Sequence, residues 1–289
     1  IGLREAIVDF DFPLGVADRL RADGLSLTVD DEALKLRRRV KSDAEMAGIR
    51  RAQTAAEAGM AAAAALLRQA EPVDGKLHVD GQPLLAEAVR AALREACERH
   101  GAPASPDVIV ASVWQGTGHE AGSGPLPAGL PIQIDLWPRD EASSCWADMT
   151  RTFVVGGEPD EEILKQERLV TEACDQVRAS AKAGVTGREL HALTCDIFEG
   201  EGYRTQRTGP GEDRTEGFQF SLGHGVGLRV HEDPSLGQAG SDPLVAGDVI
   251  AIEPGLWERN VGGVRFEDLL LITDDGCETL TRYPYDLTP

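Results

Sequence analysis

The chain contains an internal repeat, a proline-led apolar phrase that occurs once near the middle and again near the end. The first copy spans Pro125–Trp137 and the second spans Pro243–Trp257. Each copy places a carboxylate directly after an apolar run, Asp135 in the first and Glu253 in the second. Since both runs alternate as strands do, these acids share a face with their neighbours two residues away. The repeat therefore predicts a fold built from two related halves that present matched acids.

A second acid follows each copy a short distance along the chain, Asp148 after the first and Glu267 after the second. These acids are also expected on strands. Any single carboxylate in an acidic chain is usually a solvated surface group. Four at matched positions beside apolar strands would repel one another unless a cation lay between them. A pair of metal ions is the simplest arrangement that would hold them together.

Composition narrows the possible partners and the cellular location. The 289 residues are 42% hydrophobic, which is enough for a full core, and carry a formal net charge of -20. Such a chain would repel phosphate, so neither nucleic acid nor an anionic membrane is expected as a partner. The five cysteines are odd in number and form no CxxC pair, which argues against a disulfide framework and a thiolate zinc site. A reducing cytoplasm is therefore predicted.

A helix, a second helix and then strands occur in that order twice. The first unit has helices over 42–69 and 83–99 and a strand over 107–112, and Ser42 with Glu45 forms a capping-box pattern. The second has helices over 160–183 and 188–199 before its strands. The order predicts a duplicated α+β domain in which helices cover a curved, largely antiparallel sheet. Its site is expected between the halves.

Residues 1–40 are expected to differ from the rest of the chain. They show a strand over 6–10, a helix over 13–22 and a strand over 25–29, too little to bury a core alone. We interpret them as the last part of an amino-terminal α/β domain, and 41–289 as the main domain. The first residue is Ile1 rather than methionine, so the sequence is expected to begin inside a longer product.

Three histidines are candidates for a site. His224 is framed by glycines in Gly223–Gly227, which permits close backbone approach. Imidazole beside carboxylates suits manganese, cobalt, zinc or iron better than magnesium or calcium. His119 and His231 fall in loops marked by glycine or proline beside the same proposed site. The remaining histidines, in helix or turn contexts, are expected to have no role there: His78, His100 and His191.

Together these motifs resemble the M24 pita-bread metallopeptidases, which include Xaa-Pro aminopeptidases, prolidases and methionine aminopeptidases. The resemblance runs from about Arg39 to the end of the chain. The linked set is far more specific than any one motif, and its pieces are Asp148–Phe153, Gly223–Gly227, His231–Pro234, Ile252–Gly255 and Gly263–Asp268. Arg39–Ser42, where this similarity begins, and the segment before it resemble the proline-directed branch, whose members carry an extra amino-terminal domain.

The resemblance implies the metal ligands residue by residue. It makes Asp135 a bidentate ligand of one ion and gives Asp148 and Glu267 the bridging positions. His224 and Glu253 become terminal ligands of the other ion. Two divalent ions are therefore expected, with manganese first and cobalt, zinc or iron as alternatives.

The resemblance also implies a reaction and a substrate. A hydroxide bridging the ions would attack the peptide bond between an amino-terminal residue and proline. Glu253 would shuttle its proton, His231 would stabilise the tetrahedral intermediate, and His119 would contact the scissile region. The implied protein is a homodimeric Xaa-Pro aminopeptidase or Xaa-Pro dipeptidase that acts on peptides with proline at the second position.

Two positions depart from the family pattern and leave the specificity open. Trp137 stands where the family often has glycine, and the hairpin from there to Asp148 is longer, so its tip is expected to differ near the substrate. Phe220 stands where proline-directed members often carry histidine. Other readings are a different amidohydrolase or aminopeptidase specificity, a metal-free relative resembling creatinase, or a non-catalytic peptide- or protein-binding module. Metal-free and binding relatives lose ligands, whereas this chain retains the whole set.

Overall fold

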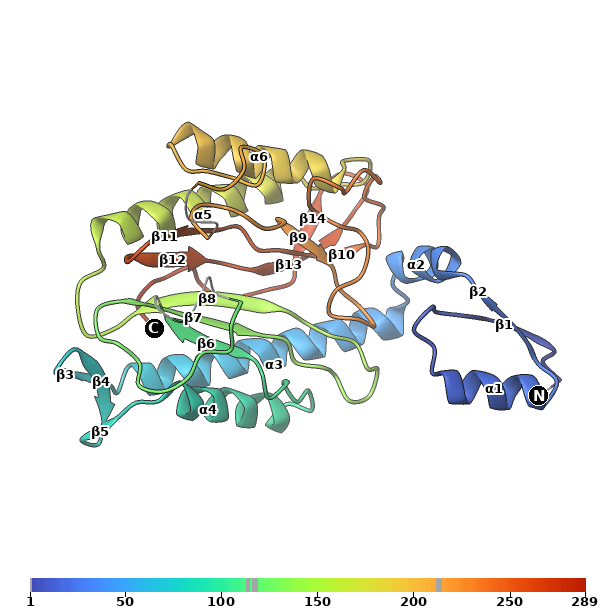
Figure 1. The fold of residues 1–289 in the computed structure, drawn as a ribbon, viewed down its shortest axis with the longest axis horizontal. Coiled ribbons are helices and arrows are strands. Elements are labelled where there is room, and N and C mark those ends of the chain that lie inside the picture. The colour runs from blue at the N-terminus through green and yellow to red at the C-terminus, as the bar shows by residue number, and fades with distance from the viewer. Residues whose placement is uncertain (1, 113–114, 116–118, 212–214) are drawn as a thin grey trace.

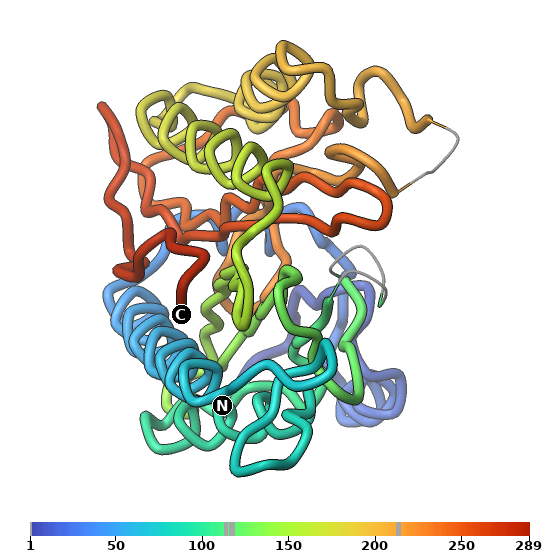
Figure 2. Tube along the Cα trace, turned by 90° about the vertical axis from the view of Figure 1, so that its left-hand side faces the viewer, coloured from blue at the N-terminus to red at the C-terminus, as the bar shows by residue number. Residues whose placement is uncertain are grey.

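Two pairs of long helices enclose the strands of the main body, one pair on each side (Figures 1 and 2). The computed structural model describes residues 2–112, 115, 119–211 and 215–289. Helix α3 packs against α4, and α5 packs against α6, with the strands between the two pairs. This arrangement confirms the duplicated α+β architecture that the repeated element order predicts.

The first half begins at the predicted capping box. In α3 (Asp43–Leu67) the Ser42 hydroxyl accepts a hydrogen bond from the Glu45 backbone amide, and the Glu45 carboxylate accepts one from the Ser42 amide. Helix α4 (Ala86–Arg99) approaches α3 closely at Gly59, where a β-carbon would lie 2.6 Å from the Cys97 sulfur. An antiparallel sheet completes this half in the order β6 (Ile109–Ser112), β7 (Pro131–Leu136) and β8 (Met149–Val154).

The second half repeats this plan with different strand lengths. Helices α5 (Glu161–Ser180) and α6 (Gly187–Gly200) cover a sheet of order β14-β13-β10-β9. The strands of this sheet are β9 (Gly223–Gly225), β10 (Val249–Ile252), β13 (Asp268–Ile272) and β14 (Cys277–Thr279). A separate hairpin joins β11 (Gly255–Glu258) to β12 (Gly262–Arg265).

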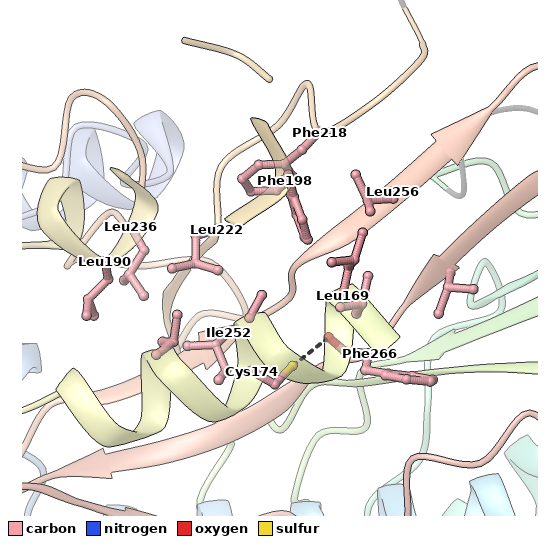
Figure 3. Close-up of a cluster of buried hydrophobic side chains, with 14 of the residues drawn as sticks. Leu169, Cys174, Leu190, Phe198, Phe218, Leu222, Leu236, Ile252, Leu256 and Phe266 are labelled. Carbon is pink, nitrogen blue, oxygen red and sulfur yellow. Dashed lines mark hydrogen bonds between the residues drawn. The ribbon is translucent and has the colours of Figure 1, made fainter. Parts of the chain in front are cut away.

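The second half is held by an apolar core between its helices and strands (Figure 3). Phe198 of α6 packs edge-to-face on Phe218, with ring centroids 5.5 Å apart. Ile252 and Leu256, which flank the position of Glu253, are buried in the same cluster. Because close-packed side chains resist displacement, this core fixes the end of β10 that carries Glu253.

The two halves join along β8 and β12. The Thr152 hydroxyl lies 3.1 Å from both the backbone nitrogen and the backbone oxygen of Arg265, accepting from the first and donating to the second. The Glu267 amide donates to the Thr150 carbonyl at 3.1 Å. Arg151, fully buried, donates to the Glu267 carbonyl and to Asp268. The junction therefore brings an acid of the second half onto the strand that begins beside Asp148.

Several element boundaries differ from the predicted ones. Helix α4 begins at Ala86 rather than at residue 83, because Gln82 and Pro83 pair with the preceding strand. That small sheet comprises β3 (Glu71–Val73), β4 (Lys76–Val79) and β5 (Gln82–Pro83). Its first hairpin turns at Asp74 and Gly75, which both have positive φ. Helix α5 ends at Ser180, three residues before the predicted end at 183.

Residues 2–40 form a small unit beside the main body, coloured blue in Figure 1. Strands β1 (Glu5–Val8) and β2 (Ser26–Val29) pair in parallel across α1 (Leu14–Ala22), close to the predicted elements. A further helix, α2 (Asp31–Arg39), was not predicted. Asp30 caps its first turn, and the basic residues Arg37 to Arg39 form its last turn, where cations favour the helix dipole.

Across the described ranges, the structure contains no helix with the length and apolar character needed to cross a membrane.

The long hairpin between β7 and β8 approaches the site with its base rather than its tip. Trp137 at the base lines a cavity that also contains Asp135 and Asp148. The tip packs against α3, where Asp140 accepts two hydrogen bonds from Arg51 at 2.9 and 2.8 Å. Asp140 also accepts from the backbone and the hydroxyl of Ser143. Asp140 therefore anchors the tip to α3, and the expectation that the tip differs near the substrate stays a prediction.

The Asp140 anchor predicts a pH-dependent stability. Hydrogen bonds from Arg51 lower the pKa of Asp140 to about 2, below its ordinary value of 3.8. A lowered folded-state pKa stabilises the protein above pH about 4, and this contribution is lost as the pH falls towards 2. Asp140→Asn should therefore lower the free energy of unfolding by about 1 kcal/mol near neutral pH, because Arg51 is half exposed and screened by solvent.

Urea unfolding of both proteins near neutral pH and at pH about 3 measures this difference. The difference in the free energy of unfolding between the two proteins should be smaller at the lower pH. Glu278→Gln, which breaks the exposed pair with Arg50, is the control and should have a smaller effect. A gap of equal size at both pH values would contradict the assignment.

Candidate metal centre

Five predicted ligands converge at the junction of the two halves. Asp135 lies on β7 and His224 at the centre of β9. Glu253 directly follows β10. The prediction that Asp148 and Glu267 lie on strands is wrong by a residue, since Asp148 precedes β8 and Glu267 lies between β12 and β13. The Glu267 amide bonds the other half of the domain instead of extending a ladder in its own sheet.

Strand register explains why these residues meet. Asp135 pairs with Thr150 across β7 and β8, so Asp148 lies diagonally opposite Asp135 on the same face. His224 pairs with Ala251 across β9 and β10, two residues before Glu253. The pairing of Ile252 with Asp268, continued by one residue, sets Glu253 opposite Glu267. Local alternation therefore chooses the face, and the pairing register assembles the cluster.

Three overlapping groups of side chains could each hold a metal ion, with their ligand atoms within 4.8 Å of one another. The groups share members, since Asp148, Glu267 and His224 each occur in two of them. The groups are Asp135, Asp148 and Glu267; His224, Glu253 and Glu267; and Asp148, His224 and His231. His231 is thus placed within reach of an ion, although the sequence assigned it only to the tetrahedral intermediate.

The carboxylates of the cluster are held in an environment that disfavours their charge. Burial, together with the charge of neighbouring acids, raises the pKa of Asp148 and of Glu267 well above their ordinary values. Burial raises the pKa of Glu253 to about 7, opposed by Arg265. Burial also raises the pKa of Asp135, again opposed by Arg265. Such a cluster is favourable only with compensating positive charge.

His224 presents an unprotonated nitrogen to this cluster. Its Nδ1 lies 3.1 Å from the Gly225 carbonyl oxygen and donates to it, which leaves the Nε2 lone pair facing inward. Nε2 lies 3.7 Å from Asp148 Oδ2 and 3.7 Å from Glu253 Oε1. Burial and the neighbouring His231 lower the pKa of His224 to about 3, so the ring is neutral near pH 7. A lone pair facing two carboxylates fits a bound cation.

Arg265 is a site residue to which sequence reasoning gave no role. It is fully buried, and its guanidinium contacts Asp135 Oδ2 and lies 3.0 Å from His119 Nε2 and 3.9 Å from Glu253 Oε2. The other oxygen of Asp135, Oδ1, is buried and has no hydrogen-bond partner within the described ranges. Thr150 was also missed, and its hydroxyl donates to Glu267 at 2.7 Å. The signal for Arg265 was its two-residue spacing from Glu267, which sets both on one face.

Two adjoining cavities open onto the cluster. The smaller, of about 250 Å³, is lined by the acids and by Ile109, Trp137 and Val230. The larger, of about 450 Å³, shares His119, His224, His231 and Glu253 with it. Phe220 lines the larger cavity and packs edge-to-face on His119, with centroids 5.1 Å apart. Both predicted loop histidines therefore face the space beside the acids.

The other histidines lie outside the cluster, as predicted. His191 on α6 is buried and lies 5.3 Å from the ring of Phe218. His100 bonds the Ala96 carbonyl at the end of α4, and His78 is near the Lys76 carbonyl in β4.

The two related halves that enclose this cluster of acids and histidine have the pita-bread fold. A model of metallopeptidase family M24 matches residues 47–274, and the chain belongs to this family. A prolidase structure from Pyrococcus horikoshii superposes with a TM-score of 0.79 at 30% identity, covering 99% of this chain and 76% of that one. An X-Pro aminopeptidase structure from Thermotoga maritima has a TM-score of 0.79 at 25% identity, covering 98% of this chain and 74% of that one.

Sequence relatives match a shorter stretch. A Xaa-Pro dipeptidase from Pyrococcus horikoshii is 41% identical over 141 residues, which cover 49% of this chain and 37% of that protein. An uncharacterized peptidase, YqhT, from Bacillus subtilis is 37% identical over 141 residues, or 49% of this chain and 36% of that protein.

The repulsion within the cluster predicts opposite effects of one substitution with and without metal. In metal-free protein, Asp148→Asn should leave the melting temperature equal to or above that of the unchanged protein, because it removes a buried acid from among like charges. With manganese at about 100 times its Kd, the unchanged protein should gain about 2.7 kcal/mol per site, and Asp148→Asn should lose most of that gain.

Thermal unfolding with chelator and with added manganese measures both effects. Asp268→Asn is the matched control, because Asp268 bonds Arg151 and Arg178 rather than the cluster. It should lower the melting temperature in both conditions and keep the gain from metal. An unchanged gain in Asp148→Asn would show that Asp148 holds no ion.

Proposed function

We propose that the protein is a dinuclear-metal exopeptidase that hydrolyses the bond between an amino-terminal residue and a following proline. The observation that carries this proposal is the convergence of Asp135, Asp148, His224, Glu253 and Glu267 on a cavity that His119 and His231 also line. The relatives named Xaa-Pro dipeptidase and prolidase support the choice of substrate. An Xaa-Pro aminopeptidase and an Xaa-Pro dipeptidase both fit this site.

The residues would divide between two ions. We assign Asp135 to one ion, His224 and Glu253 to the other, and Asp148 and Glu267 to both, in keeping with the overlapping groups. Manganese is proposed because the site combines imidazole with several carboxylates, and cobalt, zinc and iron suit the same donors. When bound, the ions supply Lewis acidity that polarises the scissile carbonyl and lowers the pKa of water to near neutrality.

The remaining groups would move protons and orient the peptide. Glu253 lines the same cavity as His119 and His231, where its carboxylate would take a proton from water and release it to the leaving nitrogen. His231 has a pKa lowered mainly by burial, so a neutral ring would donate its N–H to the developing oxyanion. His119 accepts from Arg265 at 3.0 Å, which would hold its ring toward the scissile region.

The larger cavity offers an apolar wall for the proline. Phe220 lies between His119 and Trp257, with centroids 5.1 and 6.1 Å from theirs. A pyrrolidine ring could pack on the face of Phe220, which stands where proline-directed members often carry histidine. Homodimer formation and a cytoplasmic location stay predictions of the resemblance and the composition.

A panel of peptides tests the reaction. Protein supplied with manganese or cobalt should release the first residue from Xaa-Pro dipeptides, from Xaa-Pro-Xaa peptides or from both. Matched peptides with alanine in place of proline are the control and should be cleaved more slowly. Comparing the two peptide lengths decides between dipeptidase and aminopeptidase. Inactivity with every metal and peptide, or protein that binds no metal, would favour a binding module instead.

Removing the His231 side chain tests its role. If its N–H stabilises the oxyanion, His231→Ala should lose about 3 kcal/mol of transition-state stabilisation, or roughly 100- to 1,000-fold in kcat. Steady-state kinetics on an Xaa-Pro peptide measures this loss. His78→Ala, at a position outside both cavities, should keep full activity. Near-normal turnover in His231→Ala would refute the role.

A further inference from the structure

The loop that carries His231 is short and closed on itself. Gly225 and Glu232 exchange two backbone hydrogen bonds of 2.9 Å, and the Gly227 amide donates to the Arg229 carbonyl at 3.0 Å. His231 therefore projects from a turn whose backbone is tied at both ends. Of the two residues before His231 and the two after it, most are charged. The ion-pair partners of these charged residues lie far away in the sequence.

The most deeply buried of these links is an ion pair between Lys41 and Glu232. Their side chains are 2% and 4% exposed. Lys41 Nζ donates to one oxygen of Glu232, and the other oxygen accepts from the Arg229 amide at 3.2 Å. A β-carbon on Gly227 would lie 2.5 Å from the Glu232 carboxylate and 2.8 Å from Lys41 Nζ, so the loop backbone closes directly over this pair.

Further ion pairs join the same loop to residues 9–35. Arg229 Nη2 lies 2.9 Å from Asp9 and 2.9 Å from Asp11, and Asp9 also accepts from Arg38 at 2.6 Å. On the other side of His231, Asp233 lies 3.5 Å from Lys35. These outer pairs are partly exposed, so breaking one of them should cost less than leaving a charge of the buried pair without its partner. All of them tie the His231 loop to the segment before α3.

We propose that Lys41 is a positioning residue, which acts through Glu232 to hold His231 at the distance from the metal cluster that the reaction requires. The inference rests on the proposed function. Glu232 is adjacent to His231, so a change in its anchoring moves the ring directly. A misplacement of about 1 Å can cost about 100-fold in rate, and breaking a buried ion pair leaves an unpaired charge that drives such a shift. Residues 2–41 would then control turnover without contacting the acids.

A double-mutant cycle separates positioning from a general loss of stability. Lys41→Met should lower kcat on an Xaa-Pro peptide by about 10- to 100-fold. Introduced into His231→Ala, the same substitution should change kcat less than about twofold, because its effect passes through the ring that is already absent. An equal loss in both backgrounds would overturn the proposal.

Arg39→Met is the matched control. Arg39 is two positions away and also forms a buried pair, with Asp248 at 2.6 Å, but it bonds Asp248 and Pro243 rather than the His231 loop. It should lower the melting temperature as Lys41→Met does. Its effect on kcat should be small and equal in both backgrounds. If Arg39→Met reproduces the kcat pattern of Lys41→Met, the link through Glu232 is not specific.

Amide hydrogen exchange supplies a measurement that needs no turnover. Peptides covering 225–233 should exchange faster in Lys41→Met than in the unchanged protein or in Arg39→Met. Unchanged exchange in this loop would overturn the proposal even if activity fell. Absence of Xaa-Pro cleavage by the unchanged protein, with faster loop exchange in Lys41→Met, would instead refute the proposed function and leave the anchoring of the loop established.

Discussion

Mutual repulsion among buried carboxylates is the constraint on which the rest of this structure depends. Asp135, Asp148 and Glu267 are each less than 10% exposed, and burial raises the pKa of all three. The protein itself supplies the guanidinium of Arg265, and the remaining charge calls for cations from outside. The apolar cores on both sides hold the acids together despite their repulsion. The packing of the two halves therefore keeps the acids in an arrangement that favours the binding of cations.

The two halves contribute unequally, although their sequences and element orders correspond. Asp135 is followed by a long hairpin that packs on α3, whereas Glu253 is followed by the short hairpin of β11 and β12. That short hairpin returns Arg265 to the cluster, and β9 adds His224. Duplication thus explains the scaffold. Divergence between the copies explains why the second half alone supplies the guanidinium of Arg265 and the imidazole of His224.

Several ion pairs join the amino-terminal unit to the main body. Its links to the main body include Arg39 with Asp248 and Asp9 with Arg229, and Lys41, the residue directly after the unit, pairs with Glu232. The pairs of Arg39 and Lys41 are buried, and the pair of Asp9 is partly exposed. Ion pairs at an interface favour one orientation, because a displaced charge loses its partner. The unit therefore lies against the larger cavity, to which it contributes Phe10, Lys35 and Arg38.

The sequence by itself determined the features that depend on local chemistry. Alternation set Asp135 and Glu253 on defined faces, and the Ser42 and Glu45 pattern began α3. The repeated element order predicted a duplicated α+β domain with helices covering a curved, largely antiparallel sheet. Only the tertiary structure decided which side chains meet across long sequence distances. Arg265 with Asp135, Thr150 with Glu267, and Lys41 with Glu232 depend on how two separately formed surfaces approach. Propensity and periodicity act over a few residues. The partner of a buried charge is instead the group that tertiary packing brings within a few ångströms of it.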